Sequence, residues 1–174
     1  LAKQILMIWN QWELTQSTDW LYHFNLEHCA FIHIRNGKRK KTEYESVCSD
    51  FYYEHAITRF PPHTHFLICM DEYNETIHLK QILLNHKYTF EIIHLNDVDT
   101  IQLMSHCGHG GILSNSTYSW WAGWIRLQRT HFENIQKPLL MIPSKWVHIH
   151  SNDRQKNPSL IQQSFDGFYI EGFT

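Results

Sequence analysis

Short apolar runs alternate along the chain with segments whose apolar residues recur every three or four positions. The runs CAFIHI, HFLICM, YTFEII, GILS and PLLMI are each four to six residues long and bounded by polar or turn-forming residues. Near-continuous apolar runs of this length are typical of strands that are buried on both faces. We therefore predict strands at 29–34, 65–70, 88–93, 111–114 and 138–142.

The segments between these strands have helical periodicity. In 50–60 the apolar residues fall on one face, Ser49 or Asp50 can cap the start, and the prolines at 61–62 end the pattern. Asp97 can cap another helix. We predict helices at 50–60, 75–86, 97–105 and 117–129.

Strand and helix in alternation, with short connections, predict a parallel sheet with helices on both faces, which is a Rossmann-like α/β fold. We expect three parts. They are a helical lead-in at 1–28, in which WNQWEL and TDWLYHF read as helical pieces, the Rossmann-like domain at 29–150, and a C-terminal tail at 151–174 that packs back on the domain.

Composition narrows the class of protein. The 174 residues are 43% hydrophobic and carry a formal net charge of -2, so a large core is possible and no global attraction to nucleic acid is expected. No apolar run is long enough to span a membrane. Four separated cysteines read as buried free thiols, which favours a reducing compartment. Because the chain begins with Leu1, we expect it to be part of a longer protein.

Polar side chains gather where the predicted strands end. Ligands of such sheets bind beyond the carboxyl ends of the strands. The loop after the first strand begins RNGKRKK, and the loop after the fourth contains SNST at 114–117. A helix that begins at 117 would offer N–H donors and the positive end of its dipole, while Arg35 can bind phosphate oxygens in bidentate fashion. The sequence therefore predicts a diphosphate site, with Trp120, Trp121 and Trp124 burying the helix behind it.

Several segments resemble one known family. HIRNGK at 33–38 resembles the HxRRxD motif of α-1,2- and α-1,6-fucosyltransferases, and SNSTYSWWAGWI at 114–125 resembles the ANSTFSWWGAWL motif of the α-1,2 family, glycosyltransferase family 11. LMSHCGHGGIL at 103–113, LICMDE at 67–72 and IPSKWVH at 142–148 resemble neighbouring family segments.

The resemblance implies the C-terminal, nucleotide-sugar-binding half of a GT-B glycosyltransferase. Such an enzyme transfers L-fucose from GDP-β-L-fucose to a galactoside hydroxyl of a glycan in α-1,2 linkage, with inversion and without a metal. Arg35 matches the first motif arginine, which is expected to hold the β-phosphate, and Asp71 matches an acidic position near guanine or ribose. The donor-binding residues implied are His33, Arg35, Asn36, Lys38, Asp71, Asn115, Ser116, Thr117, Ser119 and Trp120.

Two motif positions differ from the family. The second arginine is Asn36 and the aspartate is Lys38. A catalytically inactive, fucosyltransferase-like nucleotide- or glycan-binding module therefore stays open as an alternative.

An inverting transfer usually requires a base for the acceptor hydroxyl. Glu43 lies ten residues after His33, a spacing similar to that of an acidic residue in the α-1,6 relatives. Glu45 and Asp71 are weaker candidates for this base. The alternative for Glu43 is a solvent-exposed charge in a loop, without a catalytic role.

Other ligands are less consistent with the sequence. The basic loop RNGKRKK permits a solvated face, a nuclear-import patch or nucleic-acid binding, but the net charge of -2 argues against nucleic acid. The paired histidines do not have zinc-site spacing, so we expect no metal and no cofactor besides the donor substrate.

The expected partners are a nucleotide-sugar donor and a glycan acceptor. A segment outside this sequence could provide membrane association. We expect a cytoplasmic or membrane-peripheral protein if the source is microbial or viral, and a Golgi membrane protein if it is animal.

Overall fold

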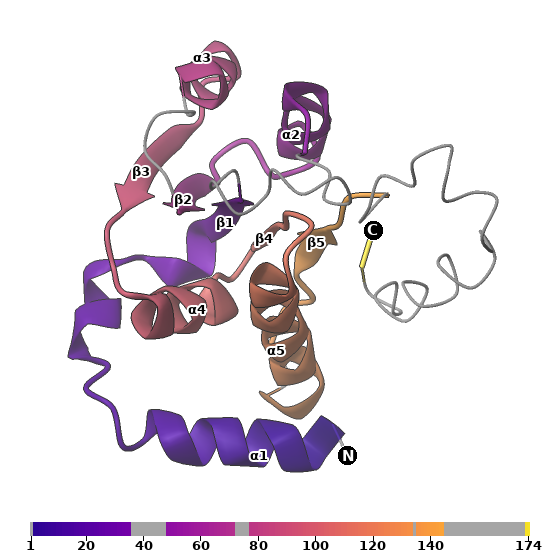
Figure 1. The fold of residues 1–174 in the computed structure, drawn as a ribbon. Coiled ribbons are helices and arrows are strands. Elements are labelled where there is room, and N and C mark those ends of the chain that lie inside the picture. Colours follow the sequence, from indigo (N-terminus) through magenta and orange to yellow (C-terminus); the bar gives the residue numbers. More distant parts are fainter. Residues whose placement is uncertain (1, 36–47, 72–76, 134, 145–172) are drawn as a thin grey trace, which may run out of the picture.

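The computed structural model describes residues 2–35, 48–71, 77–133, 135–144 and 173–174. Strands and helices alternate from residue 29 onward, after a helical N-terminal segment (Figure 1). The strands are β1 (Cys29–Ile34), β2 (His65–Met70), β3 (Thr89–Ile93), β4 (Gly110–Ile112) and β5 (Leu139–Met141). The helices are α1 (Ala2–Glu13), the 3-10 helices η1 (Asp19–His23) and η2 (Leu26–His28), then α2 (Asp50–Ile57), α3 (Ile77–Asn85), α4 (Asp97–His106) and α5 (Thr117–Glu133).

The five strands form one parallel sheet in the order β3-β2-β1-β4-β5. β1 is central, and its Ala30 pairs with Phe66 on one side and with Gly110 on the other. The chain builds the sheet outward from β1 to β3 and then crosses back to β4. This reversal between β1 and β4 is the topological switch point at which parallel sheets open a crevice.

Helices cover both faces of the sheet. α2 and α3 pack on the face that includes Ala30 and Ile32, whereas α4 and α5 pack on the face that includes Phe31 (Figure 1). All three of these β1 side chains are completely buried, as expected for a strand enclosed between two helical layers. The predicted α/β fold with an all-parallel sheet is therefore confirmed.

Several predicted boundaries shift. Ser49 caps α2 by accepting a hydrogen bond from the N–H of Tyr52, but the helix ends at Ile57 rather than at 60. At the end of the helix, the hydroxyl of Thr58 donates to the carbonyl of His55. Further along, Pro61 disfavours helical geometry at the residue before it, Phe60. α5 extends past the predicted end at 129, and β4 occupies 110–112 rather than 111–114.

The predicted cap of α4 is wrong by one residue. Asn96, not Asp97, has the extended backbone of an N-cap, and its side-chain oxygen accepts from the N–H of Asp99 at 2.9 Å. Asp97 is the first helical residue. Its carboxylate lies near the positive end of the helix dipole, where a negative charge is stabilising.

The tryptophans of α5 do not all enter the core. Trp124 is buried and Trp120 is partly buried, but Trp121 is 42% exposed. Successive helical positions are about 100° apart, so two adjacent tryptophans cannot both face the sheet. The prediction of three core tryptophans is therefore wrong for Trp121.

The loops at the amino ends of β4 and β5 are held by one buried arginine. Arg126 of α5 donates from Nε to the carbonyl of Cys107 and from Nη2 to those of Gly108 and Gln136, at 2.8, 2.8 and 3.0 Å. Gly110, the first residue of β4, has a φ of +97° and packs closely against the Leu139 carbonyl of β5. These contacts fix β4 between its neighbours.

The N-terminal segment begins with α1 and η1. Leu6 of α1 packs with Trp124 and Ile125 of α5. At the other end of the chain, Thr174 exchanges backbone hydrogen bonds with Leu140 and Ile142 beside β5. The rest of the predicted tail lies outside the described residues. Within the described part of the chain, no helix is long and apolar enough to cross a membrane.

Candidate functional site

The switch point is closed by a buried hydrogen bond between two side chains that are 81 residues apart in sequence. His33 Nδ1, at the end of β1, lies 2.7 Å from the hydroxyl of Ser114, which follows β4. His33 is 4% exposed and Ser114 is 1% exposed. This pair joins the two halves of the sheet at the carboxyl edge, where the predicted site lies.

Two tyrosines support the same edge from α2. The hydroxyl of Tyr53 donates to the His33 carbonyl at 3.1 Å, and that of Tyr52 contacts the Leu113 carbonyl at 2.7 Å. Burial is the main cause that raises the pKa of Tyr53, so its hydroxyl keeps its proton and stays a donor. The two tyrosines of α2 thus hold the carboxyl ends of β1 and β4.

A cation and an anion extend from the neighbouring strands β1 and β2. Arg35 Nη1 lies 2.8 Å from a carboxylate oxygen of Asp71, and the two side chains are 36% and 21% exposed. Partly exposed groups of this kind remain accessible to a ligand. A guanidinium has five N–H donors, so this ion pair leaves Arg35 with donors for a second anion.

The SNST segment forms the entrance to α5. The N–H of Ser116 donates to the Ser114 carbonyl at 2.8 Å, and the N–H of Trp120 donates to the Ser116 carbonyl as the first bond of the helix. The hydroxyl of Ser119 is buried and reaches the carbonyls of Ser114 and Ser116. The helix therefore begins at the switch point, and its first turn presents backbone N–H groups there.

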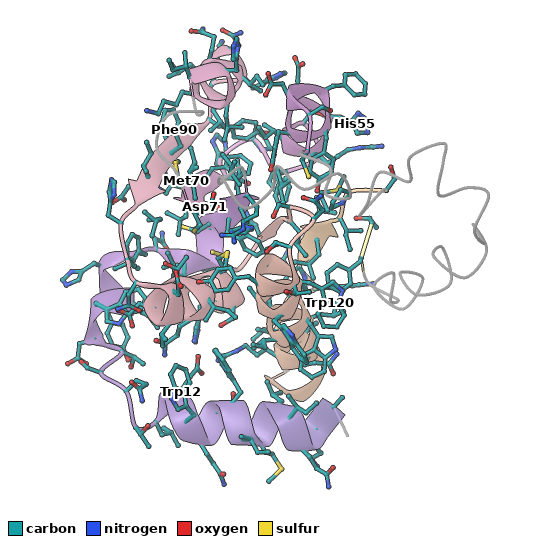
Figure 2. The ribbon with its side chains drawn as sticks, viewed as in Figure 1. Trp12, His55, Met70, Asp71, Phe90 and Trp120 are labelled. Carbon is teal, nitrogen blue, oxygen red and sulfur yellow. The ribbon has the colours of Figure 1, made fainter. Side chains whose placement is uncertain are left out.

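These elements enclose a cleft of about 290 Å³ between the carboxyl ends of the strands and the start of α5. That volume is near the lower limit for small-molecule sites. The described residues that line the cleft are His33, Arg35, Cys69, Met70, Asp71, Ile93, Leu95, Asp97, Thr100, Ser116, Thr117 and Tyr118. Figure 2 shows Met70 and Asp71 side by side at the carboxyl end of β2.

The structure brings together half of the donor-binding residues inferred from the sequence. His33, Arg35, Asp71, Ser116 and Thr117 all line the cleft. Asn115 and Ser119 are buried beneath the first turn of α5, where they shape the turn rather than line the cleft.

Trp120 lies away from the cleft. Its ring is stacked on Phe173 with centroids 6.1 Å apart, and in Figure 2 it and Asp71 lie on different sides of α5. The expected donor contact of Trp120 is therefore not supported by its position. Asn36, Lys38, Glu43 and Glu45 lie outside the described residues.

Sequence reasoning missed Tyr118 as a wall of the cleft. Its ring lies 5.4 Å from that of His33, and its hydroxyl donates to the Asp97 carbonyl in a short hydrogen bond. Burial is the main cause that raises the pKa of Tyr118. The signal for it in the sequence is its position between the motif residues Thr117 and Ser119.

The site chemistry is that of anion binding. Among the described residues, no group of three or more histidine, cysteine or acidic side chains is placed to hold a metal ion. No disulfide links the described cysteines, and burial raises the pKa of Cys69 beside the cleft to about 12, so it stays protonated. The cleft combines a guanidinium, hydroxyls and a helix N-terminus with the imidazole of His33 and the carboxylates of Asp71 and Asp97.

A parallel sheet with an anion-binding cleft at its switch point is the arrangement of proteins that bind nucleotides. Comparison with known protein families matches residues 23–136 to glycosyl transferase family 11, the α-1,2-fucosyltransferase family. The match covers more than half of the chain and includes β1 to β4 and α5. The chain belongs to this family of glycosyltransferases. No curated protein and no solved structure matched it.

Proposed function

We propose that the cleft binds GDP-β-L-fucose and that the chain is the C-terminal, Rossmann-like donor half of a GT-B fucosyltransferase. The enzyme would transfer L-fucose to a galactoside hydroxyl of a glycan in α-1,2 linkage, with inversion and without a metal. The observation that carries this proposal is the convergence of His33, Arg35 and the first turn of α5 on one cleft. Family membership supports sugar transfer from a nucleotide donor.

In this reaction the acceptor oxygen bonds to the anomeric carbon of fucose while the bond from that carbon to the β-phosphate oxygen breaks. The electron pair of the broken bond leaves with GDP, whose diphosphate gains negative charge. Preorganised donors that point to such a charge lower the barrier. We propose this role for Arg35, for the hydroxyls of Ser116 and Thr117, and for the N–H groups that open α5, since these three residues line the cleft.

Asp71 has two roles in this proposal. Its ion pair with Arg35 holds the guanidinium at the cleft, which reduces the conformational entropy that Arg35 would lose on binding phosphate. A carboxylate also accepts hydrogen bonds from the N–H groups of guanine or from ribose hydroxyls. We therefore assign Asp71 to donor binding.

The proton of the acceptor hydroxyl requires a base. One Asp71 oxygen is already engaged by Arg35, so we propose Glu43 for this step. Glu43 lies outside the described residues, and its assignment depends on the spacing of the family motif.

Calorimetric titration of the chain with GDP, with UDP and ADP for comparison, tests the proposal. We expect preferential GDP binding that EDTA does not change. Arg35→Ala should weaken it by about 10- to 100-fold, the effect of losing a charge-assisted hydrogen bond. Arg59→Ala, on an exposed turn after α2, is the matched control and should bind GDP like the parent chain. A folded chain that binds no nucleotide would contradict the proposal.

The alternative of an inactive binding module has its own outcome. Its basis is that Asn36 and Lys38 replace two motif residues. The double variant Asn36→Arg with Lys38→Asp then separates the two cases. A large gain in GDP affinity or turnover indicates a degraded active site, whereas no gain indicates a binding module.

A further inference from the structure

A second cleft lies at the other end of α5 from the first. It forms where α1, η1 and η2 approach the C-terminal ends of α4 and α5 (Figure 1). Its volume is about 690 Å³, within the range of small-molecule sites, and none of its lining residues lines the first cleft. Roughly three turns of α5 separate Thr117 from Arg129, which places the two clefts about 18 Å apart.

The charges in this second cleft are balanced. The carboxylate of Glu13 accepts from His106 Nε2 at 3.2 Å and from Arg129 Nη2 in a short ion pair. Burial alone would raise the pKa of Glu13, but the hydrogen bond from His106 and the charge of Arg129 outweigh burial and lower it. The Glu13 charge is thus neutralised within the protein, which favours an uncharged ligand over an ion.

The polar groups that line the cleft include acceptors beside the N–H groups of Arg129. Asn10 Oδ1 is buried and has no hydrogen-bond partner among the described residues. The amide nitrogen of Gln16 donates to Thr15, which leaves its oxygen as an acceptor. Each Glu13 oxygen has a further lone pair. A buried acceptor without a donor costs about 1–3 kcal/mol, so a ligand with several hydroxyl donors would recover this loss.

The walls between these acceptors are apolar. Leu14, Leu21, Phe24 and Leu26 line the cleft from the segment that follows α1. A pyranose ring matches both features, because its hydroxyls radiate from the rim while its C–H groups form an apolar face. An ionic ligand would match neither the balanced charges nor the apolar walls.

We propose that this second cleft binds a neutral saccharide unit. Its place in the reaction depends on the proposed function: the unit would belong to the glycan acceptor but lie about 18 Å from the hydroxyl that receives the sugar. The cleft would anchor a longer glycan and select it over a short one.

Titration of the ¹⁵N-labelled chain with lactose tests this proposal, with indole and phenol as apolar probes. We expect millimolar lactose binding with shift changes at Leu21 and Phe24. Asn10→Leu, which keeps the side-chain volume but removes the acceptor, should weaken binding at least about fivefold. Gln11→Leu, at an exposed position of the same helix, is the control and should have no effect. Lactose shifts confined to the first cleft, binding of the apolar probes alone, or unchanged affinity in Asn10→Leu would each overturn the proposal.

A second variant guards against a folding defect in Asn10→Leu. Thr18→Trp, at the rim of the cleft, should fill it and abolish lactose binding. Arg35→Ala separates the two proposals, since it should weaken GDP binding by about 10- to 100-fold and keep lactose binding unchanged. Lactose binding without GDP binding by the parent chain would remove the proposed function alone, and GDP binding without lactose binding would remove this inference alone.

Discussion

Arg35 and Asp71 belong to neighbouring strands and meet at the mouth of the cleft. Their side chains are partly exposed, so their attraction to each other contributes little to stability, and their value lies in how they present charge to a ligand. The anion of the pair lies next to the proposed position of a diphosphate. Asp71 therefore opposes the phosphate groups of a donor while it orients Arg35 and binds the nucleoside.

This opposition gives a prediction for Asp71→Asn. Removal of the carboxylate should leave pyrophosphate binding unchanged or strengthen it, because a negative charge near the phosphates is lost. GDP binding should lose the nucleoside contact. We expect the ratio of GDP to pyrophosphate affinity to fall by about tenfold in calorimetry, the effect of one charged hydrogen bond. Equal changes for both ligands would argue against a nucleoside contact.

At the residue scale, the sequence predicted members of the site better than their partners. His33, Arg35 and Ser116 were inferred from strand ends and motif positions. The His33–Ser114 bond and the Arg35–Asp71 pair depend on which strands are neighbours, and strand order is not visible in the spacing of apolar runs. Tyr118 was missed because an aromatic residue in an apolar helix is usually core.

Two contacts determine the position of β4 among its neighbours. Gly110 has a φ of +97°, and a Cβ there would overlap the Leu139 carbonyl of β5. Gly110→Ala should therefore lower the free energy of unfolding by about 3 kcal/mol, measured by urea denaturation. Gly123→Ala is the matched control. Its nearest neighbours are side-chain carbons at 3.2 Å and its position is helical, so it should change stability by less than about 1 kcal/mol.

Arg126 connects α5 to the loops that precede β4 and β5. Arg126→Met keeps much of the aliphatic volume but removes the donors to the carbonyls of Gly108 and Gln136. We expect a loss of about 3 kcal/mol in the free energy of unfolding, since charged buried donors are lost. Arg59→Met, at an exposed position, should be nearly neutral. Equal stability of the two variants would show that the Arg126 contacts are replaceable.

Element types were easier to predict than element ends. Periodicity identified the strands and helices from residue 29 onward, because buried strands and one-sided helices leave different apolar repeats. The ends depend on single hydrogen bonds such as that of Asn96 to Asp99. Asn96 and Asp97 are both good caps, so composition alone could not separate them.

At the scale of the whole molecule, an ion pair joins the first and the last of the described helices. Glu13 of α1 contacts Arg129 of α5, and both side chains are largely buried. The pKa of Glu13 is lowered in the folded chain, against an ordinary value of 4.5. A lowered carboxyl pKa means that its stabilising effect is complete above about pH 4.5 and is lost as the pH falls through the folded-state value.

Glu13→Gln should therefore destabilise the chain near neutral pH and much less in acid. We expect a loss of about 2–3 kcal/mol in the free energy of urea unfolding at pH 7. The difference between variant and parent should shrink steadily below about pH 4.5. Glu54, exposed on α2, offers a control, because Glu54→Gln should change the free energy of unfolding little. A constant difference across the pH range would show that the pair does not titrate with folding.

At this scale the sequence predicted the layers but not how the N-terminal segment docks. The sequence predicted helical pieces at WNQWEL and TDWLYHF, of which the first overlaps the end of α1. Its attachment through Leu6 and Glu13 to α5 joins residues more than a hundred positions apart, and no local pattern contains that information. The second cleft exists only because of this docking.

A nucleotide bound beside the His33–Ser114 contact would also contribute to the stability of the fold. The two sides of the proposed nucleotide site come from opposite halves of the chain, so a bound nucleotide would contact both across the centre of the sheet. Nucleotide binding would therefore be linked to folding, because the unfolded chain has no such site. At a ligand concentration of about one hundred times Kd, GDP would add about 2.7 kcal/mol to the free energy of unfolding. The protein would thus be most resistant to unfolding and proteolysis when its donor is abundant.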